Sequence, residues 1–416
     1  MTLEQAQWED KNDALQHTKK LFYIPQHQGE DVLYFCGNSL GLQPKSVEVA
    51  LKSELEHWKN AGVEGHFTGE MPWMHYHKFL QPQSAQLVGA AQHEVIVMNT
   101  LTVNIHLLLF SFYNPTATRF KIIMEAGAFP SDQYALETHV KQRGFEPELT
   151  IIEVAPRAGE HTLRTEDICE VIAENGDAVA LVFFSGVQYY TGQLFDIQAI
   201  TKAAKAIGAL AGFDLAHAAG NVPLQLHDWD VDFAMWCTYK YLNSGPGGPS
   251  GVFIHERHAL NKETYRLAGW WGHEETTRFK MQKGYLPMEG AAGWQMSNVP
   301  ILSCAAHKAS LDIFHGIGME ALRAKSLRLS KALINMVDNL DKKLQLHIIT
   351  PREDLARGAQ VSILTGKDGR KLFEYLSENG VIVDWREPNV IRLAAVPLYN
   401  TFEDIHKLGV LLNRFE

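Results

Sequence analysis

The 416-residue sequence lacks the features that mark several large classes of protein. Its only cysteines are Cys36, Cys169, Cys237 and Cys304, and no two of them form a CxxC pair, which disfavours a disulfide framework. No apolar run approaches the ~18 residues that a membrane-spanning helix needs, and the polar start of the chain does not resemble a signal peptide. These absences predict a cytoplasmic protein with no membrane partner.

Long runs of like charge and internal repeats are also missing. The net charge is −10 and the basic residues are scattered, so nucleic acid is disfavoured as a partner. An anionic small ligand is not excluded, because it requires only one local cluster of arginine or lysine. With 46% hydrophobic and 21% charged residues the composition is that of a globular protein, and the length favours two domains.

What the sequence does contain is an alternation of apolar, strand-like runs with helix-like segments. The strand-like runs span 94–98, 119–126, 149–156, 178–187, 211–217, 232–239 and 251–256. Strands separated by helices indicate an α/β fold with a mostly parallel, seven-stranded sheet. After about residue 300 the pattern becomes that of a smaller α+β module. We expect a large domain at 45–304, a small domain at 305–416, and an N-terminal segment at 1–44 that packs with the small domain.

Ligands of open parallel sheets bind beyond the carboxyl ends of the strands, where Lys240 stands. An apolar run leads into this lysine, tyrosines flank it, and the loop "SGPGGPSG" follows. A surface lysine is the commoner interpretation. A desolvated lysine amine, however, is a nucleophile that can form a Schiff base with a carbonyl compound. The loop is not a nucleotide phosphate loop, because in those loops the lysine follows the glycines.

Three further strand ends carry residues that suit a cofactor. Asp214 could hold the protonated ring nitrogen of pyridoxal phosphate, although it could also cap a helix. His217 follows it closely, and a structural role is the alternative. Phe129 offers a ring for stacking, while Ser131 and Thr102 stand at helix starts, which favour anions.

The segment 213–248 resembles the cofactor-lysine region of fold-type-I pyridoxal-phosphate enzymes. The stretches "YFCGNSLGLQPK", "FPSDQYA", "GWWGHE", "QMSNVPIL" and "RLAAVPLYNTFED" are more specifically similar to those of the kynureninase family, in order along nearly the whole chain. The resemblance implies a homodimer with its site at the interface and pyridoxal 5'-phosphate (PLP) as cofactor. It also implies hydrolysis of L-kynurenine or 3-hydroxykynurenine to anthranilate or 3-hydroxyanthranilate and L-alanine, in tryptophan degradation or NAD biosynthesis.

The same resemblance implies roles for individual residues. Lys240 would bind the cofactor covalently and act as the base, Asp214 would hold the ring nitrogen, and Tyr239 would donate a proton. The other implied cofactor contacts are Leu101, Thr102, Phe129, Pro130, Ser131, Asp132, Ser185 and His217, together with Trp270 and Asn298 from the second subunit. Arg392 would bind the substrate's α-carboxylate, and His66, Ser297 and Asn298 would line the pocket for its aromatic ring.

Other functions stay open at this point. The fold also hosts cysteine desulfurases and aminotransferases, and a PLP-binding protein without catalytic activity is a third alternative. A desulfurase needs a reactive cysteine on a mobile loop, and none of the four stands in such a setting. His66, His75 and His77 lie close together, but their spacing fits no standard metal site, so no metal is predicted.

Overall fold

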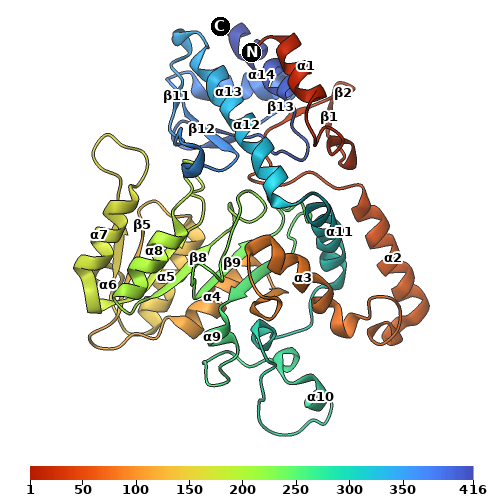
Figure 1. Ribbon diagram of the computed structural model, residues 1–416, viewed down its shortest axis with the longest axis vertical. Helices are drawn as coiled ribbons and strands as arrows, with labels where there is room; N and C mark the ends of the chain where they lie inside the picture. Colours follow the sequence, from red (N-terminus) through yellow and green to blue (C-terminus); the bar gives the residue numbers. More distant parts are fainter. Residues whose placement is uncertain (416) are drawn as a thin grey trace.

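Two sheets organise the computed structural model, which describes residues 1–415 (Figure 1). The larger sheet has the order β4-β10-β9-β8-β7-β5-β6. Its strands are β4 (Val95–Met98), β5 (Lys121–Glu125), β6 (Ile151–Val154), β7 (Val179–Ser185), β8 (Leu210–Asp214), β9 (Phe233–Cys237) and β10 (Ser250–Ile254). Among these strands β10 is antiparallel to its neighbours β4 and β9, and the other pairs are parallel. The predicted mostly parallel, seven-stranded α/β sheet is confirmed.

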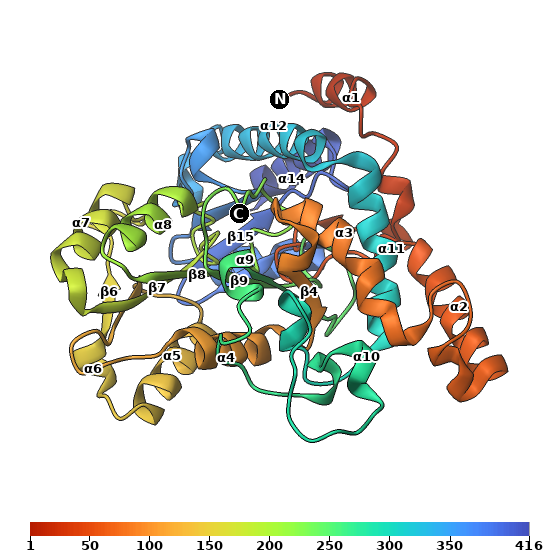
Figure 2. The ribbon, with the colours of Figure 1, turned by 60° about the horizontal axis from the view of Figure 1, so that its bottom comes forward.

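Helices cover both faces of this sheet, which explains why its strands read as continuous apolar runs. On one face α4 (Leu101–Phe112) and α5 (Pro130–Gln142) pack against strand residues such as Ile122 and Leu181. On the other face α3 (Tyr76–Val88), α7 (Thr165–Asn175), α8 (Ile197–Ala206) and α11 (Ile301–Ile317) pack against residues such as Ile123 and Val182. Figure 2 shows the strands between α7 and α8 on one side and α4 and α5 on the other.

The second sheet is antiparallel and has the order β11-β12-β15-β14. Its strands are β11 (His347–Ile348), β12 (Gln360–Leu364), β14 (Asp384–Arg386) and β15 (Val390–Ala394). The helices α12 (Met319–Asp338), α13 (Gly369–Glu378) and α14 (Phe402–Arg414) share a hydrophobic core with it. This is the predicted α+β module.

The N-terminal segment packs against that module. Its helix α1 (Leu3–Lys11) lies beside α14, and its strand β3 (Leu33–Tyr34) pairs with β13 (Val381–Ile382). The Asp10 carboxylate accepts the N–H groups of Phe402 and Glu403, at 2.8 and 2.9 Å, and so caps α14. These contacts join α1 and β3 to the module, and the predicted extent of the N-terminal segment, 1–44, stays a prediction. The boundary predicted at 304 falls inside α11, which packs on α2 (Ser46–Ala61) and α3, and it stays a prediction.

The remaining short strands and α-helices are β1 (Gln26–His27), β2 (Glu30–Asp31), α6 (Pro147–Thr150), α9 (Glu256–Ala259) and α10 (Glu275–Arg278). Within residues 1–415, none of the helices combines the length and the apolar character that a membrane crossing requires.

Candidate active site

A cavity of about 330 Å³ opens where the carboxyl ends of the large sheet face the second sheet. From the predicted set it is lined by Leu101, Thr102, Phe129, Ser131, Asp132, Ser185, Asp214, His217, Tyr239, Lys240 and Arg392. It is also lined by residues to which we assigned no role: Asn38, Ser39, Thr100, Val187, Tyr189, Ala216 and Arg386. Most of the cofactor-binding residues expected from one chain therefore meet at one place.

The topology explains this convergence. Because β4, β5, β7, β8 and β9 all run in the same direction, their carboxyl ends meet at one edge of the sheet. Asp214 is the last residue of β8 and Ser185 the last of β7, while Lys240 follows β9 by a few residues. A close backbone contact holds that turn in place, since Gly41 donates its N–H to Tyr239 O at 2.8 Å. A Cβ at position 41 would collide with Lys240 O, so the second glycine of "GNSLG", Gly41, is required for this close contact between the two backbone segments.

Lys240 is oriented by a histidine. Its Nζ lies 2.9 Å from His217 Nε2 and 5.9 Å from the centre of the Phe129 ring. Burial lowers the pKa of His217 well below its ordinary value, and the nearby positive charges of Lys240 and Arg392 lower it further. His217 is therefore neutral near pH 7, and its Nε2 accepts a hydrogen bond from the lysine amine.

Two carboxyl groups that line the cavity, those of Asp132 and Asp214, form a hydrogen-bonded pair. Burial raises the pKa of Asp132 well above its ordinary value, and the negative charge of Asp214 raises it further. Asp132 consequently keeps its proton and donates it in a hydrogen bond to Asp214. Burial raises the pKa of Asp214 as well, but the positive charge of Lys240 and the N–H of Ala216, which Asp214 accepts at 2.7 Å, favour its ionised form. The pair thus presents one carboxylate to a cationic or N–H group in the cavity.

A third buried acid, Glu125, was not predicted from the sequence. It ends β5, accepts a hydrogen bond from Ser185 Oγ at 2.5 Å, and accepts the Ser185 N–H at 3.2 Å. Burial raises the pKa of Glu125 to about 7. Glu125 fixes the end of β7 beside Asp214, with which Ser185 is paired across the sheet. Glu125 is a polar residue at the end of an apolar run. The same pattern predicted Asp214 and could also have predicted Glu125.

Two helix N-termini at the cavity form a potential anion-binding site. The starts of α4, at Thr100, and of α5, at Phe129, have no side-chain cap within the described chain. Their first-turn N–H groups and the partial positive charge of each helix are therefore available to a phosphate. The hydroxyl groups of Thr102 and Ser131 lie at the same helix starts and line the cavity.

Arginines from the second sheet line the opposite side. Arg392 on β15 is only 1% exposed, and it donates to Tyr189 O at 2.6 Å and to Asp384. Arg386 on β14 also donates to Asp384, at 3.1 Å. Because two guanidinium groups share one carboxylate, this side of the cavity carries a net positive charge that suits an anionic ligand. No role was predicted for Arg386, since the pairing of β14 with β15 cannot be read from spacing alone.

Five predicted residues do not line the cavity of a single chain: Pro130, Trp270, Ser297, Asn298 and His66. Pro130 begins α5 beside it. The Trp270 side chain is 49% exposed, and Ser297 and Asn298 are exposed on a loop. The His66 ring packs edge-on against Trp73, with 5.3 Å between ring centres. The pocket predicted for the substrate's aromatic ring is thus not assembled within one chain.

The sequence matches known proteins over nearly its whole length. It is 51% identical to kynureninase from Flavobacterium psychrophilum over 99% of this chain and 98% of that protein. It is also 51% identical to kynureninase from Myxococcus xanthus, over 96% of this chain and 93% of that protein. Residues 322–412 match the family model described as the kynureninase C-terminal domain.

Solved structures of lower sequence identity share the fold. A cysteine desulfurase from Thermococcus onnurineus superposes with a TM-score of 0.77 at 18% identity, covering 92% of this chain and 94% of that one. A mutant of C-DES with glycine covalently linked to the PLP-cofactor superposes with a TM-score of 0.78 at 17% identity, covering 92% and 97%. These likenesses confirm the fold-type-I architecture. Together with the identity of about one half to curated kynureninases over almost every residue, they lead to one conclusion: the chain belongs to the kynureninase family.

Proposed function

We propose that this protein binds PLP and hydrolyses L-kynurenine or 3-hydroxykynurenine at the Cβ–Cγ bond. The products are anthranilate or 3-hydroxyanthranilate, together with L-alanine. One observation carries the proposal: a lysine, a buried acid pair and a buried arginine converge on one cavity in a chain of this family. A cytoplasmic location and a role in tryptophan degradation or NAD biosynthesis accompany the proposal.

The residues at the cavity suit PLP. The uncapped starts of α4 and α5 suit its phosphate, and the Asp132–Asp214 pair suits its pyridine nitrogen. The amine of Lys240 suits its aldehyde. One buried atom, His217 Nδ1, has no hydrogen-bond partner among residues 1–415, which indicates that a polar ligand completes the site. When bound, PLP supplies a ring that takes up the negative charge developing at the substrate's Cα.

The chain's own residues position the substrate and move its protons. Arg392 binds the α-carboxylate with its planar fork. Lys240 Nζ removes the α-proton, and its contact with His217 Nε2 keeps the amine in place. The Asp214 carboxylate keeps the proton on the ring nitrogen. Burial raises the pKa of the Tyr239 phenol, so Tyr239 holds its proton until it donates it to the β-carbon that becomes the methyl group of alanine.

A homodimer would complete the aromatic pocket. Trp270, Ser297 and Asn298 stand at the surface instead of in the cavity of their own chain. Near Trp270 the apolar side chains of Phe279 and Met281 are also exposed. Exposed aromatic and methionine side chains that gather in one region are typical of interfaces between subunits. The exposure of this region supports the contribution of Trp270 and Asn298 to the site of a partner.

The cysteines disfavour a desulfurase. Among residues 1–415 no cysteine lines the cavity. Burial raises the pKa of the Cys36 thiol to about 12 and also raises the pKa values of Cys169, Cys237 and Cys304. Sulfur transfer requires a thiolate nucleophile near the substrate, which none of these residues provides.

The proposed reaction is tested with the purified, PLP-loaded protein and L-kynurenine. We expect fluorescent anthranilate and L-alanine to appear in a one-to-one ratio, and comparison of kcat/KM for L-kynurenine and 3-hydroxykynurenine will identify the preferred substrate. A keto-acid requirement with accumulation of aminated cofactor would instead establish an aminotransferase. If neither substrate gave any product, the protein would be a cofactor-binding protein without this activity, and the proposed reaction would be wrong.

The Arg392→Lys variant tests how the substrate is held. Lysine keeps the positive charge but lacks the planar pair of donors, so we expect KM for L-kynurenine to rise at least about tenfold while kcat changes less. Arg352→Lys is the matched control, because Arg352 pairs with Asp338 on the surface of the same part of the chain. Steady-state kinetics of both variants decide the question, and an unchanged KM in Arg392→Lys would remove this residue from its role.

A further inference from the structure

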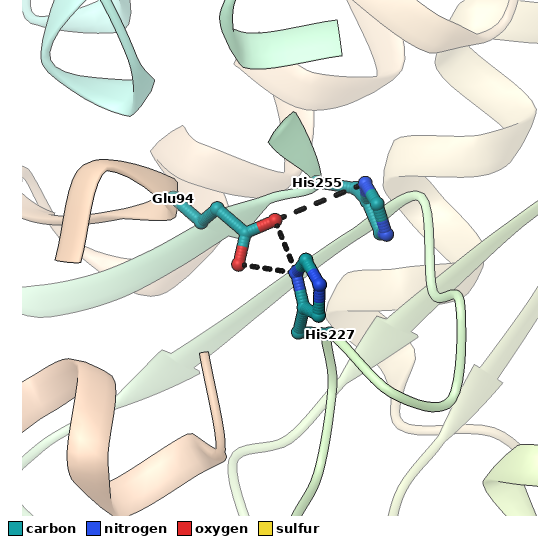
Figure 3. A group of neighbouring side chains, drawn as sticks. All are labelled: Glu94, His227 and His255. Atoms are coloured by element: carbon teal, nitrogen blue, oxygen red, sulfur yellow. Dashed lines mark hydrogen bonds and ion pairs between the residues drawn. The ribbon is translucent and has the colours of Figure 1, made fainter. Parts of the chain in front are cut away.

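We propose that Glu94, His227 and His255 form a binding site for one divalent transition-metal ion of the Zn²⁺ type. The site lies at the edge of the large sheet opposite to the PLP cavity, and it is shown in Figure 3. No spacing in the sequence indicates it, because the three residues are far apart along the chain. It is independent of the proposed catalytic function.

The sheet topology brings the three residues together. Glu94 closes the short turn before β4, His227 lies in the connection from β8 to β9, and His255 directly follows β10. Because β10 runs antiparallel to β4 and β9, its carboxyl end meets the amino ends of both. The catalytic residues lie at the other ends of these strands. An ion here would therefore link the start of the edge strand β4 to the end of β10 and to the connection between β8 and β9, without contacting the cavity.

The distances suit a small tetrahedral ion. His227 Nδ1 lies 2.9 and 3.0 Å from the two Glu94 oxygens, and His255 Nδ1 lies 3.8 Å from Glu94 Oε1. The two imidazole rings are stacked at 4.9 Å with an interplanar angle of 15°, so both present Nδ1 to the carboxylate. With bonds of about 2.0–2.1 Å, the ligand atoms of tetrahedral zinc are about 3.3 Å apart. The three atoms need only small side-chain movements to reach that spacing.

Hydrogen bonds to the backbone show that His255 Nδ1 is an acceptor. It accepts the N–H of Arg257 at 3.3 Å, which places the ring proton on Nε2, the atom that faces Asp230 Oδ1 at 3.5 Å. Glu94 Oε1 is also an acceptor and accepts the N–H of Glu256 at 2.7 Å. Two acceptors, His255 Nδ1 and Glu94 Oε1, thus lie near each other with no hydrogen bond between them, and an ion that replaces these backbone contacts would bind both. An outer carboxylate behind a histidine is the usual arrangement at metal sites.

The surrounding charges both oppose and favour an ion. The hydrogen bond to Glu94 raises the pKa of His227, so the ion must displace the proton that this histidine holds. Arg257 is a nearby positive charge, but it forms ion pairs with Asp230 and Asp232, which offset its repulsion of an ion. Glu256 adds negative charge near His227. His227 is partly exposed, which provides a path for the ion and room for water as the fourth ligand.

The experiment uses the PLP-loaded full-length protein, without an affinity tag and dialysed against a chelator. We expect calorimetric titration with Zn²⁺ to show one ion per chain, and Co²⁺ to give the visible absorption of a tetrahedral nitrogen and oxygen site. At about one hundred times Kd, Zn²⁺ should raise Tm by about 3–5 °C. Turnover should not change, because the site does not reach the cavity.

Two variants and one control connect these signals to the site. His227→Gln and His255→Gln should each lose the Co²⁺ absorption and the Zn²⁺-dependent rise in Tm. His93→Gln should keep both, because His93 adjoins Glu94 in the chain but its ring faces Glu256 at 3.4 Å. The proposal is overturned if wild-type protein gives no one-to-one binding. It is equally overturned if His227→Gln and His255→Gln, both folded by circular dichroism, bind the ion as wild type does.

Discussion

Replacing Lys240 with alanine is expected to abolish the turnover of L-kynurenine. In the proposed mechanism this lysine has two functions, because it binds the cofactor and acts as the base at the substrate's α-carbon. Loss of a base alone costs about 10²–10⁴-fold in rate, so the loss of both functions should exceed 10³-fold, by the same order-of-magnitude estimate. The purified variant should also lose the visible absorption of covalently bound PLP.

The controls separate chemistry from folding. Lys202→Ala removes an exposed lysine from the helix α8, which packs on the large sheet, and should leave both activity and absorption unchanged. Added methylamine should partly restore turnover in Lys240→Ala, since a small amine can enter the vacated space and accept the proton. Multiple turnovers by Lys240→Ala without added amine would contradict the role of this lysine.

Most strands of the large sheet could be predicted because they are almost completely buried, the exception being β6, which is partly exposed. A strand covered on both faces, such as β7 or β9, is apolar at nearly every position, so it stands out from the alternating patterns around it. The polar residues that end such strands, Asp214 above all, could be predicted for the same reason. The helix at 319–338 was harder to delimit, because the helical pattern continues to 344 while α12 ends at Asp338.

What could not be predicted depends on contacts between distant segments. Arg386 reaches the cavity only because β14 pairs with β15, and Glu125 matters only because β5 and β7 are neighbours. His217 could be placed near Asp214, but its bond to Lys240 depends on how the turn after β9 folds. Trp270 and Asn298 lie outside the cavity of their own chain, so in the proposed homodimer their positions relative to a substrate are set by contacts with a second chain.

Asp214→Asn is expected to lower kcat by about 10²–10⁴-fold while PLP still binds through Lys240. The amide keeps the size of the side chain and an oxygen for the Ala216 N–H, but it carries no negative charge to hold a proton on the ring nitrogen. Cofactor content, measured by absorption, should therefore stay close to wild type. A kcat within about threefold of wild type would exclude Asp214 from this role.

Asp132 provides an internal comparison. The negative charge of Asp214 raises the pKa of Asp132, so removing that charge lets Asp132 ionise more readily and partly replace its neighbour. We therefore expect Asp132→Asn alone to reduce kcat less than Asp214→Asn, and the double variant to be slower than either. The residual activity of Asp214→Asn should rise with pH as Asp132 loses its proton, and this rise should be absent from the double variant. Equal pH profiles for the single and double variants would mean that Asp132 only positions Asp214 and never takes over its charge.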